Sequence, residues 1–179
     1  MRHGERGFSV RSVQGQASYY YSQPFFTLSG TLTLPDGDVP VIGTAWLDRE
    51  WSSQPLAADQ TGWDWFSISF EEGEKVMGFR LRQSDGTYFT SGTWIEADGS
   101  ATPLSNGSFD ATPLETSNVG DREIPTQWQV ILPDHDVDVT VTAINTQAWM
   151  DMAVPYWEGP VRISGNRKGI GYLEMTGYE

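Results

Sequence analysis

The sequence contains no cysteine in its 179 residues, so disulfide bonds, thiol nucleophiles and thiolate metal sites are excluded. Histidine is almost as scarce, with only His3 and His135. No Gly-x-Ser-x-Gly motif is present, which argues against a Ser-His-Asp triad. With two histidines and no cysteine, the sequence has too few ligands for a typical zinc site. Asp134, Asp136 and Asp138 alternate as calcium ligands might, but the glycine that a calcium-binding loop needs does not follow them. We therefore predict no metal and no cofactor.

Basic residues are also few, with 11 against 24 acidic residues and a net charge of −13. Such a surface repels phosphate backbones and anionic lipid headgroups, so we predict no nucleic-acid partner. No stretch approaches the ~20 apolar residues of a membrane-spanning helix. Residues 1–9 are polar and do not resemble a signal peptide, so the protein is cytosolic or its export signal lies outside this sequence.

No window has a sustained helical period, although one or two helical turns fit 54–60 or 146–152. Asp36-Gly37, Asp85-Gly86 and Asp98-Gly99 instead predict tight hairpin turns, because both residue types tolerate positive φ. Between the turns, apolar and polar residues alternate, most plainly over 136–143. Further predicted strands lie at 25–34, 39–47, 63–70, 77–82, 87–96, 128–132, 160–165 and 169–178.

Residues 1–17 hold little periodic apolar pattern, so we predict a tail or interdomain linker there. Residues 18–179 then form one domain. Successive hairpins, whose strands alternate between apolar and polar residues, predict an all-β, antiparallel, closed or nearly closed barrel.

Aromatic residues are abundant, with eight tryptophans, seven tyrosines and eight phenylalanines. Trp63 and Trp65 share one strand face while Phe66, Ile68 and Phe70 take the other, so both faces are apolar. Either the rings simply pack, or several of them line a cavity for a flat or polyunsaturated ligand.

One segment, 46–54, combines carboxylates with tryptophans. In an extended chain Asp48 and Glu50 point to one side, and Arg49 and Trp51 to the other. Two carboxylates at this spacing are roughly 7 Å apart, from a rise of ~3.3 Å per residue. Mutual repulsion and burial can raise one pKa and create a general acid beside a general base. The alternative is a structural ion pair of Arg49 with Asp48, Glu50 or Asp64.

A second segment of this kind is 155–159, where Tyr156 and Glu158 supply a proton donor and acceptor, or merely a structural hydrogen bond. The predicted catalytic residues are Asp48, Glu50, Asp64 and Glu158. The predicted substrate-binding residues are Trp46, Arg49, Trp51, Trp63, Trp65, Tyr156 and Trp157.

Several of these segments resemble one known family. The residues that carry the likeness are Ala17–Ser22, Trp46–Gln54, Gly62–Phe66, Tyr156–Gly159 and Gly171–Tyr178. Together they resemble the lipocalin-like predicted secreted hydrolases of bacteria, which include AttH-like proteins and carotenoid 1,2-hydratases.

The resemblance implies two consecutive lipocalin-like domains, of which this chain is the second, with a ligand site near their junction. It implies an exported, periplasmic or secreted protein. Carotenoid hydratases carry histidine after the aspartate of the first motif, where this chain has Arg49.

These observations allow three functions. The first is an enzyme that hydrates, isomerises or cyclises a lipophilic, unsaturated small molecule. Asp48 or Glu50 would protonate a double bond, Asp64 or Glu158 would accept a proton, and tryptophan faces would stabilise the cation. The second is a lipophilic-ligand carrier without chemistry, and the third is an interdomain-packing module.

Overall fold

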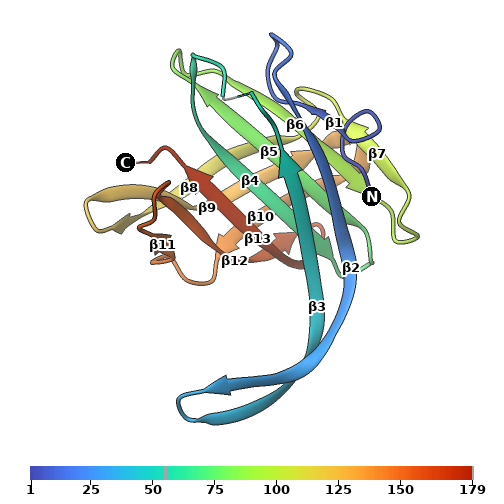
Figure 1. Cartoon of the computed structure of the whole chain (residues 1–179), viewed down its shortest axis with the longest axis vertical. Coiled ribbons are helices and arrows are strands. Elements are labelled where there is room, and N and C mark those ends of the chain that lie inside the picture. The colour runs from blue at the N-terminus through green and yellow to red at the C-terminus, as the bar shows by residue number, and fades with distance from the viewer. Residues whose placement is uncertain (55, 179) are drawn as a thin grey trace.

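The structure is a computed structural model that describes residues 1–54 and 56–178. It consists of two antiparallel β-sheets, one of three strands and one of ten (Figure 1). The small sheet has the order β1-β2-β3, with β1 Phe8–Val10, β2 Ala17–Leu34 and β3 Gly37–Trp51.

The large sheet has the order β7-β6-β5-β4-β13-β12-β10-β9-β8, with β11 pairing β12. Its first five strands along the chain are β4 Gln60–Phe70, β5 Lys75–Gln83, β6 Tyr88–Ile95, β7 Ala101–Leu104 and β8 Asp110–Val119. The remaining strands are β9 Arg122–Leu132, β10 Val137–Ala143, β11 Trp149–Met150, β12 Tyr156–Gly165 and β13 Gly169–Thr176. A short 3₁₀ turn, Pro133–His135, joins β9 to β10.

The all-β prediction is confirmed, and the large sheet curls through 195° into a half-barrel of the lipocalin-like type. The three predicted Asp-Gly turns lie where the chain reverses between β2 and β3, β5 and β6, and β6 and β7. Their glycines Gly37, Gly86 and Gly99 all have positive φ, as such turns require. No helix occurs at 146–152, where β11 lies instead.

Side chains from both ends of the large sheet meet inside the half-barrel and fill it. Phe66 of β4 packs edge-on against Trp128 of β9, with ring centroids 5.4 Å apart, and also contacts Phe109. Trp128, Trp157, Phe66 and Phe109 are all fully buried. The inside of the half-barrel is therefore a packed core built by alternate residues of the large sheet, chiefly from β4, β9, β10, β12 and β13.

The small sheet covers part of the outside of the half-barrel. A second apolar cluster joins Tyr20 of β2 to Phe79 and Leu81 of β5, with Trp63 and Trp65 packed beside them. Both faces of β4 are thus covered, which explains why its sequence is apolar on both. Beyond this contact the β2–β3 hairpin projects away from the body as a long arm (Figure 1).

The segment predicted as a tail or linker lies against the sheets. β1 pairs with β2, and His3 is fully buried. A role for this segment in linking two domains stays a prediction. No helix in the described part of the chain has the length and apolar character needed to cross a membrane.

Candidate functional site

The candidate site is a cavity of about 530 Å³ between the small sheet and the outside of the half-barrel. This volume suits a small organic ligand. The cavity is lined by Arg11, Tyr20, Trp46, Asp48, Glu50, Leu56, Trp63, Trp65, Ser67, Phe79, Leu81, Glu158, Tyr172 and Glu174. It therefore combines aromatic walls with carboxylates drawn from three strands.

The C-terminal end of β3 forms one wall of the cavity, through every second side chain of the strand. Trp46, Asp48 and Glu50 point inward and line it, because successive side chains of a strand take opposite faces. Arg49 and Trp51 point the other way and are exposed. Trp51 stacks with Tyr19, at 6.0 Å between ring centroids, on the far side of the small sheet.

The opposite wall comes from the outer face of the large sheet. Trp63 and Trp65 project from β4, and Glu158 and Glu174 project from β12 and β13. These two glutamates are directly paired across the β12–β13 ladder, so both stand on one face. The cavity thus faces the second sheet rather than the inside of the half-barrel.

Two hydrogen bonds orient the tryptophan rings. Trp63 donates its indole N–H to Glu174 Oε1 at 2.7 Å, and Trp65 donates to the Tyr20 hydroxyl at 2.8 Å. The buried indole nitrogen of Trp46 has no hydrogen-bond partner within the described residues. The Trp46 side chain instead helps to lower the pKa of the Asp48 carboxyl.

Burial raises the pKa of several acidic groups around the cavity. It raises the pKa of Asp48, which a hydrogen bond from Ser22 opposes, and the pKa of Glu174, which the Trp63 hydrogen bond opposes. Burial likewise raises the pKa of Glu158. None of the ion pairs among the described residues involves a carboxylate of this cavity. Protonation near neutral pH is therefore easier here than at a surface carboxylate.

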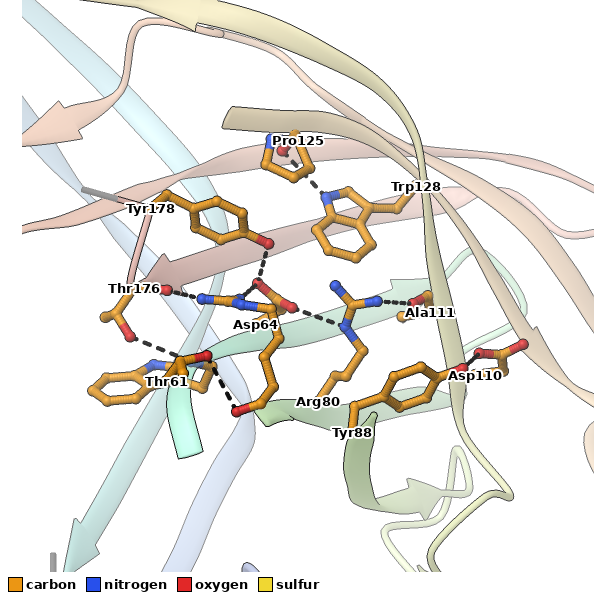
Figure 2. Close-up of polar contacts among 12 residues, drawn as sticks. Thr61, Asp64, Arg80, Tyr88, Asp110, Ala111, Pro125, Trp128, Thr176 and Tyr178 are labelled. Carbon is orange, nitrogen blue, oxygen red and sulfur yellow. Dashed lines mark hydrogen bonds and ion pairs between the residues drawn. The ribbon is translucent and has the colours of Figure 1, made fainter. Parts of the chain in front are cut away.

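Asp64 lies elsewhere, on the inner face of β4, and is 0% exposed (Figure 2). Arg80 Nε bonds its Oδ2 at 2.9 Å, while Arg82 and the Tyr178 hydroxyl donate to its Oδ1. Arg80 also donates to the Ala111 carbonyl at 3.0 Å. The structural ion pair anticipated for Arg49 is thus formed by Arg80 and Arg82, and the Asp64 carboxylate does not line the cavity.

The segment around Glu158 is divided between the two faces of β12. Trp157 is fully buried inside the half-barrel, where its indole donates to the Thr146 carbonyl at 2.8 Å. Tyr156 shares the outer face with Glu158, beside the cavity. Of the predicted site residues, the structure brings Trp46, Asp48, Glu50, Trp63, Trp65 and Glu158 together in the cavity.

Sequence reasoning missed several cavity residues, among them Tyr20, Arg11, Tyr172 and Glu174. Tyr172 and Glu174 alternate with Leu173 and Met175, so period two within the segment 171–178 marks them. No local pattern marks Arg11. Within the described ranges, no three His, Asp or Glu side chains are grouped as metal ligands would be.

Comparison with known proteins gives a consistent result. A comparison with curated proteins gives no match. The chain is similar to an AttH candidate from Nitrosomonas europaea, of known crystal structure, with 33% sequence identity and a TM-score of 0.91. The alignment covers 99% of this chain and 58% of that chain. The profile described as AttH-like matches residues 1–178. The chain therefore belongs to the AttH-like family.

Proposed function

We propose that the cavity binds a lipophilic, unsaturated small molecule and that Asp48 acts on it as a general acid. The observation that carries the proposal is the meeting of three indole rings with Asp48, Glu158 and Glu174 in one cavity. Burial keeps the pKa of each of these carboxyl groups raised. Aromatic walls suit an apolar ligand, and raised pKa values suit a proton donor at neutral pH.

In a hydration step, the Asp48 carboxyl gives its proton to one carbon of a double bond, and the neighbouring carbon becomes cationic. The faces of Trp46, Trp63 and Trp65 stabilise that cation. Water adds to the cation and loses a proton to Glu158. In isomerisation, the cation instead loses a C–H proton to Glu158. In cyclisation, a second double bond first attacks the cation, and the new cation then loses a C–H proton to Glu158. Asp48 recovers its proton from solvent.

Binding is tested with retinol, a neutral polyene, by energy transfer from tryptophan. Trp46→Ala should weaken binding by about 1 kcal/mol, or roughly fivefold, because an aromatic contact is lost. Trp51→Ala is the matched control, since Trp51 lies on the same strand but faces away from the cavity. Equal affinities of the two variants, or no binding by the wild type, would contradict the binding site.

Chemistry is tested by incubating polyenes with the protein and measuring by mass spectrometry a gain of one water, or a changed retention at constant mass. Asp48→Asn should abolish conversion and retain binding. Glu72→Gln, in the exposed β4–β5 turn, is the control. Ligand recovered unchanged from the wild type would favour the alternative, a carrier without chemistry.

A second role concerns the arm, the distal part of the β2–β3 hairpin. Its exposed apolar side chains are Phe25, Phe26, Leu28, Leu32, Leu34, Val39, Ile42 and Leu47. An exposed apolar surface of this size is typical of an interface. Since this chain spans only 58% of its Nitrosomonas relative, we propose that a preceding lipocalin-like domain covers the arm. The family resemblance further suggests export to the periplasm or beyond.

The arm is tested by hydrogen exchange on this chain and on a longer chain that includes the preceding domain. We expect slower exchange at 25–47 in the longer chain. Unchanged exchange would contradict a domain contact there.

A further inference from the structure

Asp48 is connected to the interior of the protein by a continuous series of side-chain hydrogen bonds. The Ser22 hydroxyl donates to Asp48 Oδ1. Ser22 Oγ also lies 2.5 Å from Nε2 of His3, and Nδ1 of His3 lies 2.8 Å from Oγ1 of Thr93. The series therefore runs from β6 through the N-terminal segment and β2 to the cavity.

Three of these four groups are inaccessible to solvent. His3 and Ser22 are 0% exposed, and Thr93 is 1% exposed. The backbone N–H of His3 donates to the Tyr20 carbonyl at 3.0 Å, and its ring lies 4.2 Å from the Tyr20 ring. Neither His3 nor Ser22 lines the cavity, and their hydrogen-bonded connection to it runs through Asp48.

The direction of each hydrogen bond follows from donor and acceptor counting. Burial lowers the pKa of His3 to about 3, so its ring is neutral at pH 7, with one donor and one acceptor nitrogen. Because the Ser22 proton goes to the carboxylate, Ser22 Oγ must accept from His3 Nε2–H. Nδ1 then has no proton and accepts from the Thr93 hydroxyl. Every proton in the series points toward Asp48.

Other ionisable groups also face Asp48, but none of them belongs to the series of hydrogen bonds that runs from Thr93 to Asp48. They are Tyr20 from β2, Glu50 from β3, Glu158 from β12, Glu174 from β13 and Arg11 from the segment before β2. The negative charge of Glu50 opposes the ionisation of Asp48, whereas the polar groups of Ser22, Trp46 and Tyr20 favour it, with Ser22 the largest of the three.

We propose that His3 is a positioning residue for Asp48: acting through Ser22, it keeps Oδ1 as a permanent hydrogen-bond acceptor, so that the exchangeable proton is carried by Oδ2. This inference rests on the proposed function, since it assigns the oxygen from which a ligand takes its proton. Addition and loss of that proton leave the buried hydrogen bonds unchanged, and no proton needs to enter the interior.

The first experiment is ¹⁵N NMR of the histidine rings in the ligand-free protein between pH 4 and pH 8. We expect His3 to show protonated Nε2 and unprotonated Nδ1 throughout, while His135 serves as the internal comparison. A His3 ring that is protonated at Nδ1, or that becomes cationic within this range, would overturn the proposal. The measurement needs no substitution, so it does not depend on how any variant folds.

The second experiment measures the pKa of Asp48 from its carboxyl ¹³C shift in variants of His3. His3→Leu removes the donor to Ser22, and the pKa of Asp48 should rise above its wild-type value. His3→Gln keeps an N–H donor and should restore the wild-type value. A merely structural role for His3 would leave the pKa of Asp48 unchanged in every folded variant, and that result would overturn the proposal.

The outcomes separate this inference from the proposed function. If retinol binds but His3 has the other tautomer, the cavity stands and the positioning role falls. If the tautomer and the pKa response are as expected but no polyene binds or reacts, the positioning role stands and the proposed function falls.

Discussion

The buried carboxylate of Asp64 gives the sharpest test of the structure, because two arginines depend on it. Asp64→Asn removes the negative charge between Arg80 and Arg82 while preserving the size of the side chain. Removal of one partner of a buried ion pair costs about 3–5 kcal/mol. Asparagine retains one acceptor oxygen for one arginine, so we expect the lower end, ~3 kcal/mol.

This loss of unfolding free energy corresponds to a measurable decrease in the melting temperature, Tm. An unfolding entropy of about 2.1 cal/mol/K per residue gives roughly 0.38 kcal/mol/K for the 179 residues. Asp64→Asn should therefore lower Tm by about 8 °C in calorimetry or circular dichroism. Asp36→Asn, in the exposed turn of the hairpin, is the control and should leave Tm almost unchanged. A decrease in Tm no larger than in the control would refute the structural role of Asp64. If the Asp64→Asn variant folds but no longer binds retinol, Asp64 would instead belong to the binding site.

Two further substitutions test the cavity and the core. Burial raises the pKa of Glu174, so its ionisation opposes folding: below its ordinary pKa this penalty is absent, and it grows as pH rises through the raised value. Glu174→Gln keeps an acceptor for Trp63 and should raise Tm at pH 7 but not at pH 4; an equal effect at both pH values would contradict burial as the cause. Gly78→Ala places a Cβ within 2.5 Å of the Phe109 ring and should cost about 1–3 kcal/mol in chemical denaturation. Gly30→Ala, whose Cβ meets nothing within 4 Å, is its control, and similar midpoints for the two would show that the core is looser than described.

Local sequence patterns were enough to predict much of the fold. Alternation along 136–143 and Asp-Gly turns at three positions correspond to β10 and to three hairpins. β8 was not predicted, because its sequence is polar and most of its residues are exposed at the end of the sheet. β2 and β3 extend beyond their predicted ends, where Tyr19–Ser22 pairs with Asp48–Trp51.

The site was predictable where alternation alone decides which face a residue takes. Asp48 and Glu50 lie on one side of β3 for that reason. Asp64 alternates with Trp63 and Trp65 just as regularly, but sequence cannot say which face of β4 meets the core and which meets a second sheet. The same ambiguity applies to Trp157 and Glu158. The series from His3 to Asp48 joins residues 3, 22, 48 and 93, and only the tertiary structure brings those positions together.

The two sheets form separate hydrogen-bonded ladders, and the cavity lies between them. Its width is therefore set by side chains and not by strand pairing. A substitution at Phe79 or Leu81 alters the gap without changing the register of any strand, whereas enlarging the inside of the half-barrel would require rebuilding its core. Side chains between the two sheets can therefore change the size of the cavity while both sheets stay constant, and libraries that vary the cavity are best confined to these positions.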